Sequence, residues 1–151
     1  MSHSMHRHRG FSIVEVLVAL VVLAIGLLGI AGLYVESLRS GGAAINRMQA
    51  INLAMDLADR IRANRTATVA YAGAPSATYT CIGAGAVACT PQQLAADDLQ
   101  QWNGEITSIL PQGTGLVAVD NTVTPVSYDI TVQWSEPGQA DPLAYVLRLQ
   151  I

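Results

Sequence analysis

The feature that most constrains this chain is an apolar stretch near its start. It runs from Gly10 to Val35, with the sequence GFSIVEVLVALVVLAIGLLGIAGLYV. From Val16 to Val35, twenty consecutive residues carry no charge. At about 1.5 Å per residue, a helix of this length spans about 30 Å, which is the thickness of the hydrocarbon core of a bilayer. The sequence therefore predicts one membrane-spanning helix.

The residues before this stretch are polar and basic, and they predict its orientation. Arg7 and Arg9 favour a cytoplasmic N-terminus, with everything after the span exported. A secretory signal peptide has a shorter apolar region followed by a small-residue cleavage site, so we do not expect removal on the far side of the membrane. A plain single-pass anchor fits the length and the orientation.

A plain anchor does not explain Glu15, an acidic residue at the start of the apolar stretch. An ionised carboxylate costs roughly 2.5–3.5 kcal/mol at the centre of a membrane helix, although near the helix end it can snorkel towards water. If the chain is cut after Gly10, Phe11 carries a free α-amino group four residues before Glu15, and such residues are neighbours on a helix. The carboxylate then neutralises this amine, or the amine of an adjacent subunit, as helices pack together.

The string Gly10-Phe11-Ser12-Ile13-Val14-Glu15 resembles the type IV prepilin signature. That signature has a short basic leader, glycine at the cleavage site, phenylalanine next, glutamate at the fifth mature position and then an apolar helix. The longer strings VEVLVALVVLAIGLLGIAGL and LAMDLADRIRANR resemble the PilV family of minor pilins. The resemblance covers the N-terminal third well and the rest more loosely, through CTPQQLAADDLQQW and LPQGTG.

This resemblance implies that the prepilin peptidase cleaves between Gly10 and Phe11 and methylates the new N-terminus of Phe11. It implies partners as well: the major pilin, other minor pilins and the inner-membrane pilus assembly platform. The protein would first lie in the inner membrane with a periplasmic head, and later in the extracellular pilus. The expected function is a minor pilin that supports pilus assembly and priming, twitching motility and cell adhesion. A minor pseudopilin of a type II secretion system is the alternative.

Composition argues against other function classes. The chain has a formal net charge of −3, and its eight basic residues are all arginine. Loss of Arg7 and Arg9 with the leader leaves six arginines against eleven acids, which argues against nucleic-acid binding. Without lysine, and with its three histidines confined to the leader, a mature chain offers no Schiff-base lysine and no Ser-His or Cys-His pair. We therefore expect no catalytic site, although a membrane-anchored periplasmic enzyme or binding protein is a third interpretation.

The histidines His3, His6 and His8 resemble a metal-binding tract, because imidazole is a common ligand. They lie within the expected leader and would not reach the mature protein. We therefore predict no metal site and no cofactor.

Helical periodicity continues beyond the membrane stretch. A set of apolar residues recurs at helical spacing: Ala50, Leu53, Ala54, Leu57, Ala58 and Ile61. Charged residues fall mostly on the other side of the same helix: Arg47, Asp56, Asp59, Arg60 and Arg62. We expect one helix that ends near Asn64, while the alternative is two helices broken at Gly41-Gly42.

The residues from Thr66 to Ala96 contain no charge and are dominated by glycine, alanine, threonine and proline, which predicts a loop. Cys81 and Cys89 lie within it. An exported chain meets an oxidising compartment, where such a pair persists as a disulfide. A catalytic thiol would need a histidine, so we predict that Cys81 and Cys89 are disulfide-bonded.

The rest of the chain predicts a short helix and three strands. Thr90 caps a helix that starts at Pro91 and continues to Trp102. One face of this helix would carry Leu94, Ala95, Asp98, Leu99 and Trp102. We expect Asp97 and Asp98 on a solvated edge, with one capping or partner contact.

Three segments rich in β-branched and aromatic residues predict an antiparallel meander: Gly115–Asp120, Val126–Trp134 and Leu143–Ile151. The alternation of Val126, Tyr128, Ile130, Val132 and Trp134 with polar residues predicts one buried face.

The fold expected from these elements is an α+β, pilin-like fold, in which a long N-terminal helix packs on a small antiparallel sheet. The chain would divide into a cleaved leader (1–10), a transmembrane or filament-core half of the helix (11–35), an amphipathic half (36–64) and a periplasmic head (65–151).

Overall fold

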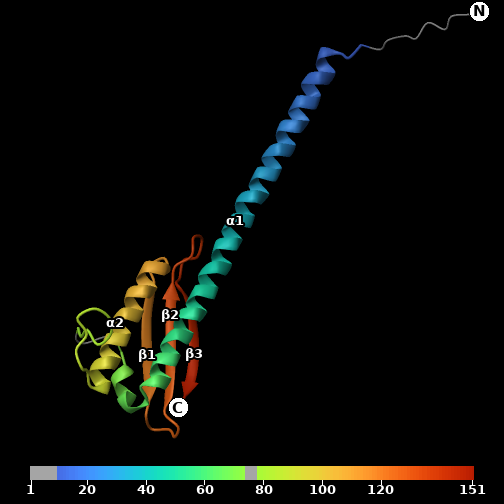
Figure 1. The fold of residues 1–151 in the computed structure, drawn as a ribbon. Helices are drawn as coiled ribbons and strands as arrows, with labels where there is room; N and C mark the ends of the chain where they lie inside the picture. Colours follow the sequence, from blue (N-terminus) through green and yellow to red (C-terminus); the bar gives the residue numbers. More distant parts are fainter. Residues whose placement is uncertain (1–9, 74–77) are drawn as a thin grey trace, which may run out of the picture. The chain divides into compact units, whose positions relative to one another are not determined.

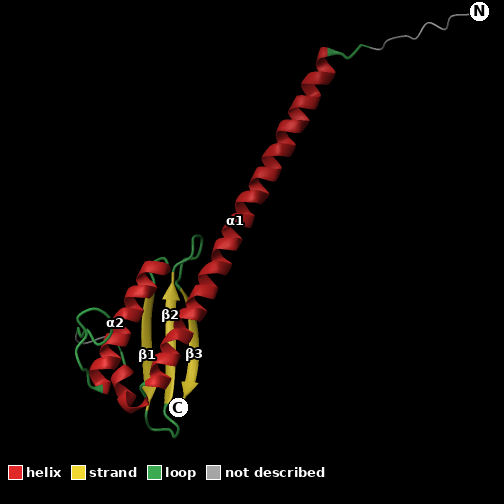
Figure 2. Ribbon diagram, viewed as in Figure 1, coloured by secondary structure: helices red, strands yellow, loops and turns green. Residues whose placement is uncertain are grey.

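The computed structural model describes residues 10–73 and 78–151. Its elements are a long helix, a 3-10 helix, a second helix and three strands (Figures 1 and 2). Their bounds are α1, Ile13–Ala63; η1, Arg65–Tyr71; α2, Pro91–Ile109; β1, Thr114–Asp120; β2, Ser127–Trp134; and β3, Leu143–Gln150. The expected leader residues before Gly10, with the histidine tract, lie outside the described residues.

The chain forms two compact units that divide after Gly42, within α1. In the first unit, every described residue is exposed, including the apolar residues from Phe11 to Leu38. Helix α1 includes Gly41 and Gly42 without an interruption. The predicted single helix ending near Asn64 is thus confirmed in extent.

The second unit, residues 43–151, is the globular unit and contains the core. Helix α1 buries one stripe in it, made of Ala50, Leu53, Ala54, Leu57, Ala58 and Ile61. These are the six residues that the helical periodicity singled out. Small and branched aliphatic side chains at this spacing let the helix lie close against its neighbours. The amphipathic face of the long helix is therefore confirmed.

The three strands form an antiparallel sheet in the order β1-β2-β3. Val117 of β1 pairs with Ile130 of β2, and Ile130 pairs with Leu147 of β3. On β2 the predicted buried face is confirmed for Tyr128, Ile130, Val132 and Trp134. In Figure 1, α2 lies over β1 and the end of α1 lies over β2 and β3, so both helices cover one face of the sheet. This is the predicted α+β, pilin-like arrangement.

Two expectations about local structure are wrong. The residues from Thr66 to Tyr71 were expected to be loop, but they belong to η1, because Ala67 and Tyr71 insert into the core. The second helix was expected to end at Trp102, but it continues to Ile109, where burial of Ile106 holds the added turns.

The close approach of β1 to α2 depends on Gly115. A Cβ at this position would lie 2.6 Å from Cδ1 of Ile106 and would also overlap the ring of Trp102, and both side chains are fully buried. Gly104, in the middle of α2, has open space around the same position. One glycine is therefore required by packing, whereas the other is not.

We predict that Gly115→Ala destabilises the fold by about 1–3 kcal/mol, because overpacking a rigid core forces side chains out of their preferred rotamers. Gly104→Ala is the matched control, and it should be neutral or stabilising by up to about 1 kcal/mol, because alanine is the better helix former. Thermal unfolding of the two purified variants tests this. Equal melting temperatures for the two variants would contradict it.

Candidate functional site

The candidate site is the segment from Gly10 to Glu15, at the start of α1. Gly10, Phe11 and Ser12 precede the helix, and all three are exposed. Ser12 begins the helix, because its Oγ accepts a hydrogen bond from the Val14 N–H at 3.3 Å, and its carbonyl accepts one from the Glu15 N–H at 3.1 Å. The first helical turn therefore begins two residues after the predicted cleavage position.

The Ser12 cap was not predicted from the sequence. Serine followed three residues later by glutamate is a typical helix-start pattern, so Ser12 and Glu15 together carried the signal. The same geometry places Glu15 in the first turn, where the positive end of the helix dipole favours a carboxylate.

The structure brings Phe11 and Glu15 to one side of the helix. Both residues border a shallow groove, which continues along α1 through Val16, Ala19, Leu20 and Leu23. Phe11 has an exposed fraction of 82%. Phe11 and Glu15 thus line the same groove, and both residues are exposed and accessible to another molecule.

The apolar part of α1 is exposed in this structure. Among the described residues, α1 is the one helix long and apolar enough to cross a membrane, with a mean hydropathy of 2.9 over its most apolar window. None of that window is buried. Exposing so many large aliphatic side chains to water would be very unfavourable, so this surface requires lipid or other helices around it.

Comparison with known families addresses the same segment. Residues 5–31 match the prokaryotic N-terminal methylation motif, and residues 32–100 match the family model described as type IV pilin Tt1218. The chain is a type IV pilin. The methylation motif implies processing by a prepilin peptidase, and a pilin is a structural subunit that assembles into a pilus. Searches of curated proteins and of solved structures found no match.

In this pilin, the loop before α2 is held at two points. Cys81 and Cys89 form the predicted disulfide, with their Cα atoms 5.7 Å apart. The Cys81 N–H also donates to Oδ2 of Asp97 at 3.0 Å. The disulfide closes the loop on itself, and Asp97 attaches it to α2.

The expectation that Asp97 and Asp98 lie on a solvated edge is wrong, because both are buried, with exposed fractions of 3% and 4%. Asp98 Oδ2 accepts a hydrogen bond from the Tyr71 hydroxyl at 2.6 Å, and Oδ1 lies 3.8 Å from Nη1 of Arg60. Each carboxylate is buried because a specific donor from another segment reaches it. A pattern of residue spacing along α2 does not reveal such donors.

Arg60 was expected on the solvated side of α1, but its side chain has an exposed fraction of only 21%. Its guanidinium donates to Asp56 at 2.8 Å and to Glu105 of α2 at 3.2 Å. Next to it, Asn64 donates to the Tyr71 hydroxyl at 3.3 Å and to the Pro91 carbonyl at 2.8 Å. This polar cluster joins the end of α1 to η1 and α2.

The cluster shifts the pKa values of Asp98 and Tyr71. Burial raises the pKa of Asp98 above its ordinary value of 3.8, while the Tyr71 hydrogen bond and the Arg60 charge partly offset this. Burial, with the bond to Asp98, raises the pKa of Tyr71 as well. Tyr71 is therefore protonated at any physiological pH and donates to Asp98.

These groups have structural roles in the pilin. Among residues 10–73 and 78–151, no group of three or more His, Cys, Asp or Glu side chains is placed to hold a metal ion. The carboxylates of the polar cluster are occupied by donors from their own chain. The cluster therefore fixes the position of η1 and α2 on α1.

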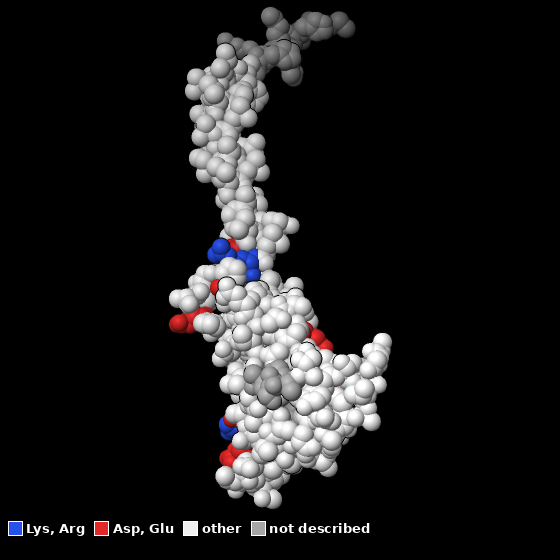
Figure 3. All heavy atoms as spheres, turned by 90° about the vertical axis from the view of Figure 1, so that its left-hand side faces the viewer, with Lys and Arg blue, Asp and Glu red and all other residues white. Residues whose placement is uncertain are grey.

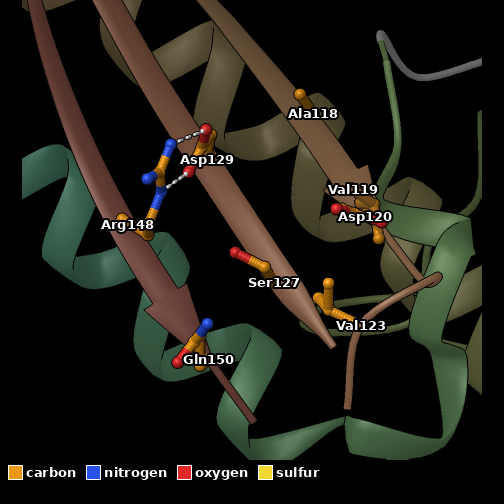
Figure 4. A pocket seen from close by; sticks show the side chains of 8 residues that line it. All are labelled: Ala118, Val119, Asp120, Val123, Ser127, Asp129, Arg148 and Gln150. Carbon is orange, nitrogen blue, oxygen red and sulfur yellow. Dashed lines mark hydrogen bonds and ion pairs between the residues drawn. The ribbon is translucent and has the colours of Figure 1, made fainter. Parts of the chain in front are cut away.

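A second pair of charges lies on the more exposed face of the sheet (Figure 4). Arg148 of β3 donates two hydrogen bonds to Asp129 of β2, at 2.7 and 2.8 Å. Ser127 and Gln150 border the same shallow depression. The bonds from Arg148 hold the pKa of Asp129 below its ordinary value.

We predict that Asp98→Asn changes the pH dependence of stability. The pKa of Asp98 is raised on folding. The contribution of this carboxyl group to the free energy of unfolding therefore falls as pH rises from the ordinary pKa of 3.8 through the raised pKa of the folded state. Asparagine still accepts the Tyr71 hydrogen bond but does not titrate. Urea unfolding at several pH values should show a flatter dependence in this range for the variant, and an unchanged slope would contradict the assignment.

We also predict that Tyr71→Phe lowers the free energy of unfolding by about 1.5–3 kcal/mol at neutral pH, because it removes the hydrogen-bond donor to a buried carboxylate. Tyr145→Phe is the control, since its hydroxyl makes no hydrogen bond within the described residues. The loss for Tyr71→Phe should shrink towards pH 3, where Asp98 is protonated. The same unfolding experiment measures both variants, and equal losses for the two would contradict this role.

Proposed function

We propose that this pilin is a minor pilin of a type IV pilus, of the PilV kind. The leader, residues 1–10, is removed by the prepilin peptidase, and the amine of Phe11 becomes the methylated N-terminus. Residues 11–35 anchor the chain in the inner membrane with its N-terminus in the cytoplasm, and later enter the filament core. Residues 36–64 support the periplasmic head, residues 65–151.

One observation carries this proposal: Phe11 and Glu15 border the same groove at the start of a fully exposed apolar helix. After cleavage, a positive amine lies within one helical turn of a carboxylate, at the end of a helix that needs apolar neighbours. Glu15 therefore sets the position of the subunit relative to its neighbour in the filament, by attracting the N-terminal amine of the neighbouring chain. In a low-dielectric surrounding such a pair is much stronger than in water.

The surface of the globular unit fits a structural role. Figure 3 shows one face of the molecule, on which charged atoms are sparse. Such a surface suits contact with the major pilin and other minor pilins. The inner-membrane assembly platform would extract the subunit, and the resulting pilus would support twitching motility and adhesion.

Intact-mass measurement and N-terminal sequencing test the processing step. We expect the mature chain to start at N-methyl-Phe11 and to occur in sheared pili. A processed chain found with the secretion apparatus instead of pili would favour a type II secretion pseudopilin. An uncut chain, in cells with an active prepilin peptidase, would mean a plain anchored protein.

We predict that Glu15→Ala is cleaved normally but enters filaments poorly, because the neighbouring amine loses its counter-charge. Glu36→Ala is the matched control, since it removes an exposed acid from the same helix outside the apolar stretch, and it should enter filaments normally. Immunoblots of sheared filaments and membranes measure both steps. Normal incorporation of the Glu15→Ala chain would contradict the registration role.

We predict that Gly10→Val leaves the chain uncleaved in the inner membrane, because a branched side chain keeps the peptidase from approaching the backbone. Its electrophoretic mobility should match the precursor. A product of mature size would contradict this.

A further inference from the structure

The pairing of β2 with β3 identifies the backbone groups that point out of the sheet. The Ile151 N–H donates to the Val126 carbonyl at 3.0 Å, which makes this a hydrogen-bonded pair in the β2–β3 register. Hydrogen-bonded and non-bonded pairs alternate along an antiparallel ladder. The outward-pointing N–H and C=O groups of β3 therefore belong to Ala144, Val146, Arg148 and Gln150.

The opposite edge of the sheet, on β1, is partly bonded within the chain. By the same alternation, the backbone groups of Gly115, Val117 and Val119 point outward from β1. The Gly115 N–H donates to Oδ1 of Asn103 at 3.3 Å, and the Val117 carbonyl accepts from the Gly73 N–H at 2.9 Å. A side chain and a backbone N–H from the chain itself thus bind two of the outward groups of β1.

The β3 edge has no such cover. Within residues 10–73 and 78–151, no hydrogen bond reaches the outward backbone groups of β3. The strand has eight residues in unbroken register, without a proline, a lysine or a bulge, which are the usual guards of an edge strand. Its one charge, Arg148, is already paired with Asp129. Val146, in the middle of the edge, has an exposed fraction of 54%.

A groove of about 290 Å³ adjoins the start of this edge. Its lining is mostly apolar and aromatic: Arg47 and Ile51 of α1, Trp134 of β2, and Leu143, Ala144 and Tyr145 of β3. The carboxylate of Glu136 accepts the Trp134 indole N–H at 3.1 Å, and it lies 3.9 Å from Nε of Arg47. Arg47 has an exposed fraction of 61%, so its charge at the rim is only loosely paired.

We propose that the β3 edge binds an extended segment of a neighbouring pilin subunit, which adds a fourth strand to the sheet. The outward N–H and C=O groups bind its backbone, and backbone pairing supplies affinity in this mode of recognition. One apolar side chain of the segment enters the groove, and an acidic side chain beside it pairs with Arg47. The identity of the partner as a pilin rests on the proposed function.

A photo-crosslinking residue in place of Ala144 tests this in cells that produce the full-length chain. After irradiation, mass spectrometry of the cross-linked peptides should show one extended segment of another pilin subunit. The same residue in place of Leu116, which is exposed on β1, is the control position and should not capture that segment.

Val146→Pro, combined with the photo-crosslinking residue, removes the outward N–H that the sheet itself does not use. Proline is tolerated at such edge positions. The cross-link should fall about tenfold, because one hydrogen bond is lost and its acceptor is left unpaired. Val146→Ala keeps the N–H and is the matched control, with an unchanged cross-link. Arg47→Gln should reduce the cross-link severalfold without touching the strand.

Melting temperatures of the variants show which of them fold. If Val146→Pro does not fold, the cross-link yield of Arg47→Gln tests the proposal instead. No cross-link at Ala144 to a pilin, or equal yields for Val146→Pro and Val146→Ala, would overturn the proposal. Filament incorporation of the unaltered chain is measured in the same cells. If the chain enters filaments without the cross-link, only the proposed binding at the β3 edge is contradicted. If the cross-link to a pilin forms but the chain stays outside filaments, binding at the β3 edge is supported and the minor-pilin role is contradicted.

Discussion

Trp102 of α2 contacts α1 and β1, and the globular unit depends on these contacts. Its indole N–H donates to the Leu53 carbonyl of α1 at 2.8 Å, and its ring packs where Gly115 of β1 offers no side chain. A buried indole needs a partner for its N–H, and here a helix carbonyl provides it. The two helices and the first strand are thereby fixed at one point, and the β2 and β3 side chains complete the core around it.

The polar cluster acts on the same junction from the other side. The cluster joins Arg60 of α1, Tyr71 of η1 and Asp98 of α2. The Arg60 guanidinium offsets the charge of the Asp98 carboxylate, and the Tyr71 hydroxyl donates a hydrogen bond to it. A buried carboxylate without such donors would be strongly destabilising. The polar cluster also positions the disulfide loop, because Asp97, next to Asp98 in the chain, accepts a hydrogen bond from the Cys81 N–H. The loop therefore depends on the core for its attachment.

Most of this fold could be predicted from sequence because its elements have strong periodic signals. The stripe from Ala50 to Ile61 follows a helical repeat, and the alternation from Tyr128 to Trp134 follows a strand repeat, so both were identified correctly. The burial of Asp98 and Arg60 was not, because it depends on partners far away in the sequence. Helix η1 was missed since glycine- and alanine-rich composition hides the two residues, Ala67 and Tyr71, that enter the core.

The candidate site was predicted as a set of residues, and the comparisons support the family to which it belongs. Geometry added the Ser12 cap and the shared groove of Phe11 and Glu15. Cleavage, methylation and subunit registration are events between molecules, so they remain predictions for Gly10, Phe11 and Glu15. In the structure all three residues are exposed, and Phe11 and Glu15 line one groove.

The two edges of the sheet have one further consequence, for aggregation. Sheets with two open edges can add copies without limit, which is the route to fibrils. In this chain Asn103 and Gly73 bind two of the outward backbone groups of β1, whereas within the described residues the β3 edge has no such bonds. Two copies that met through β3 would each use up this edge, and further copies could be added only through the partly bonded β1 edge. The fold can thus expose one unpaired strand edge at a lower risk of unlimited growth.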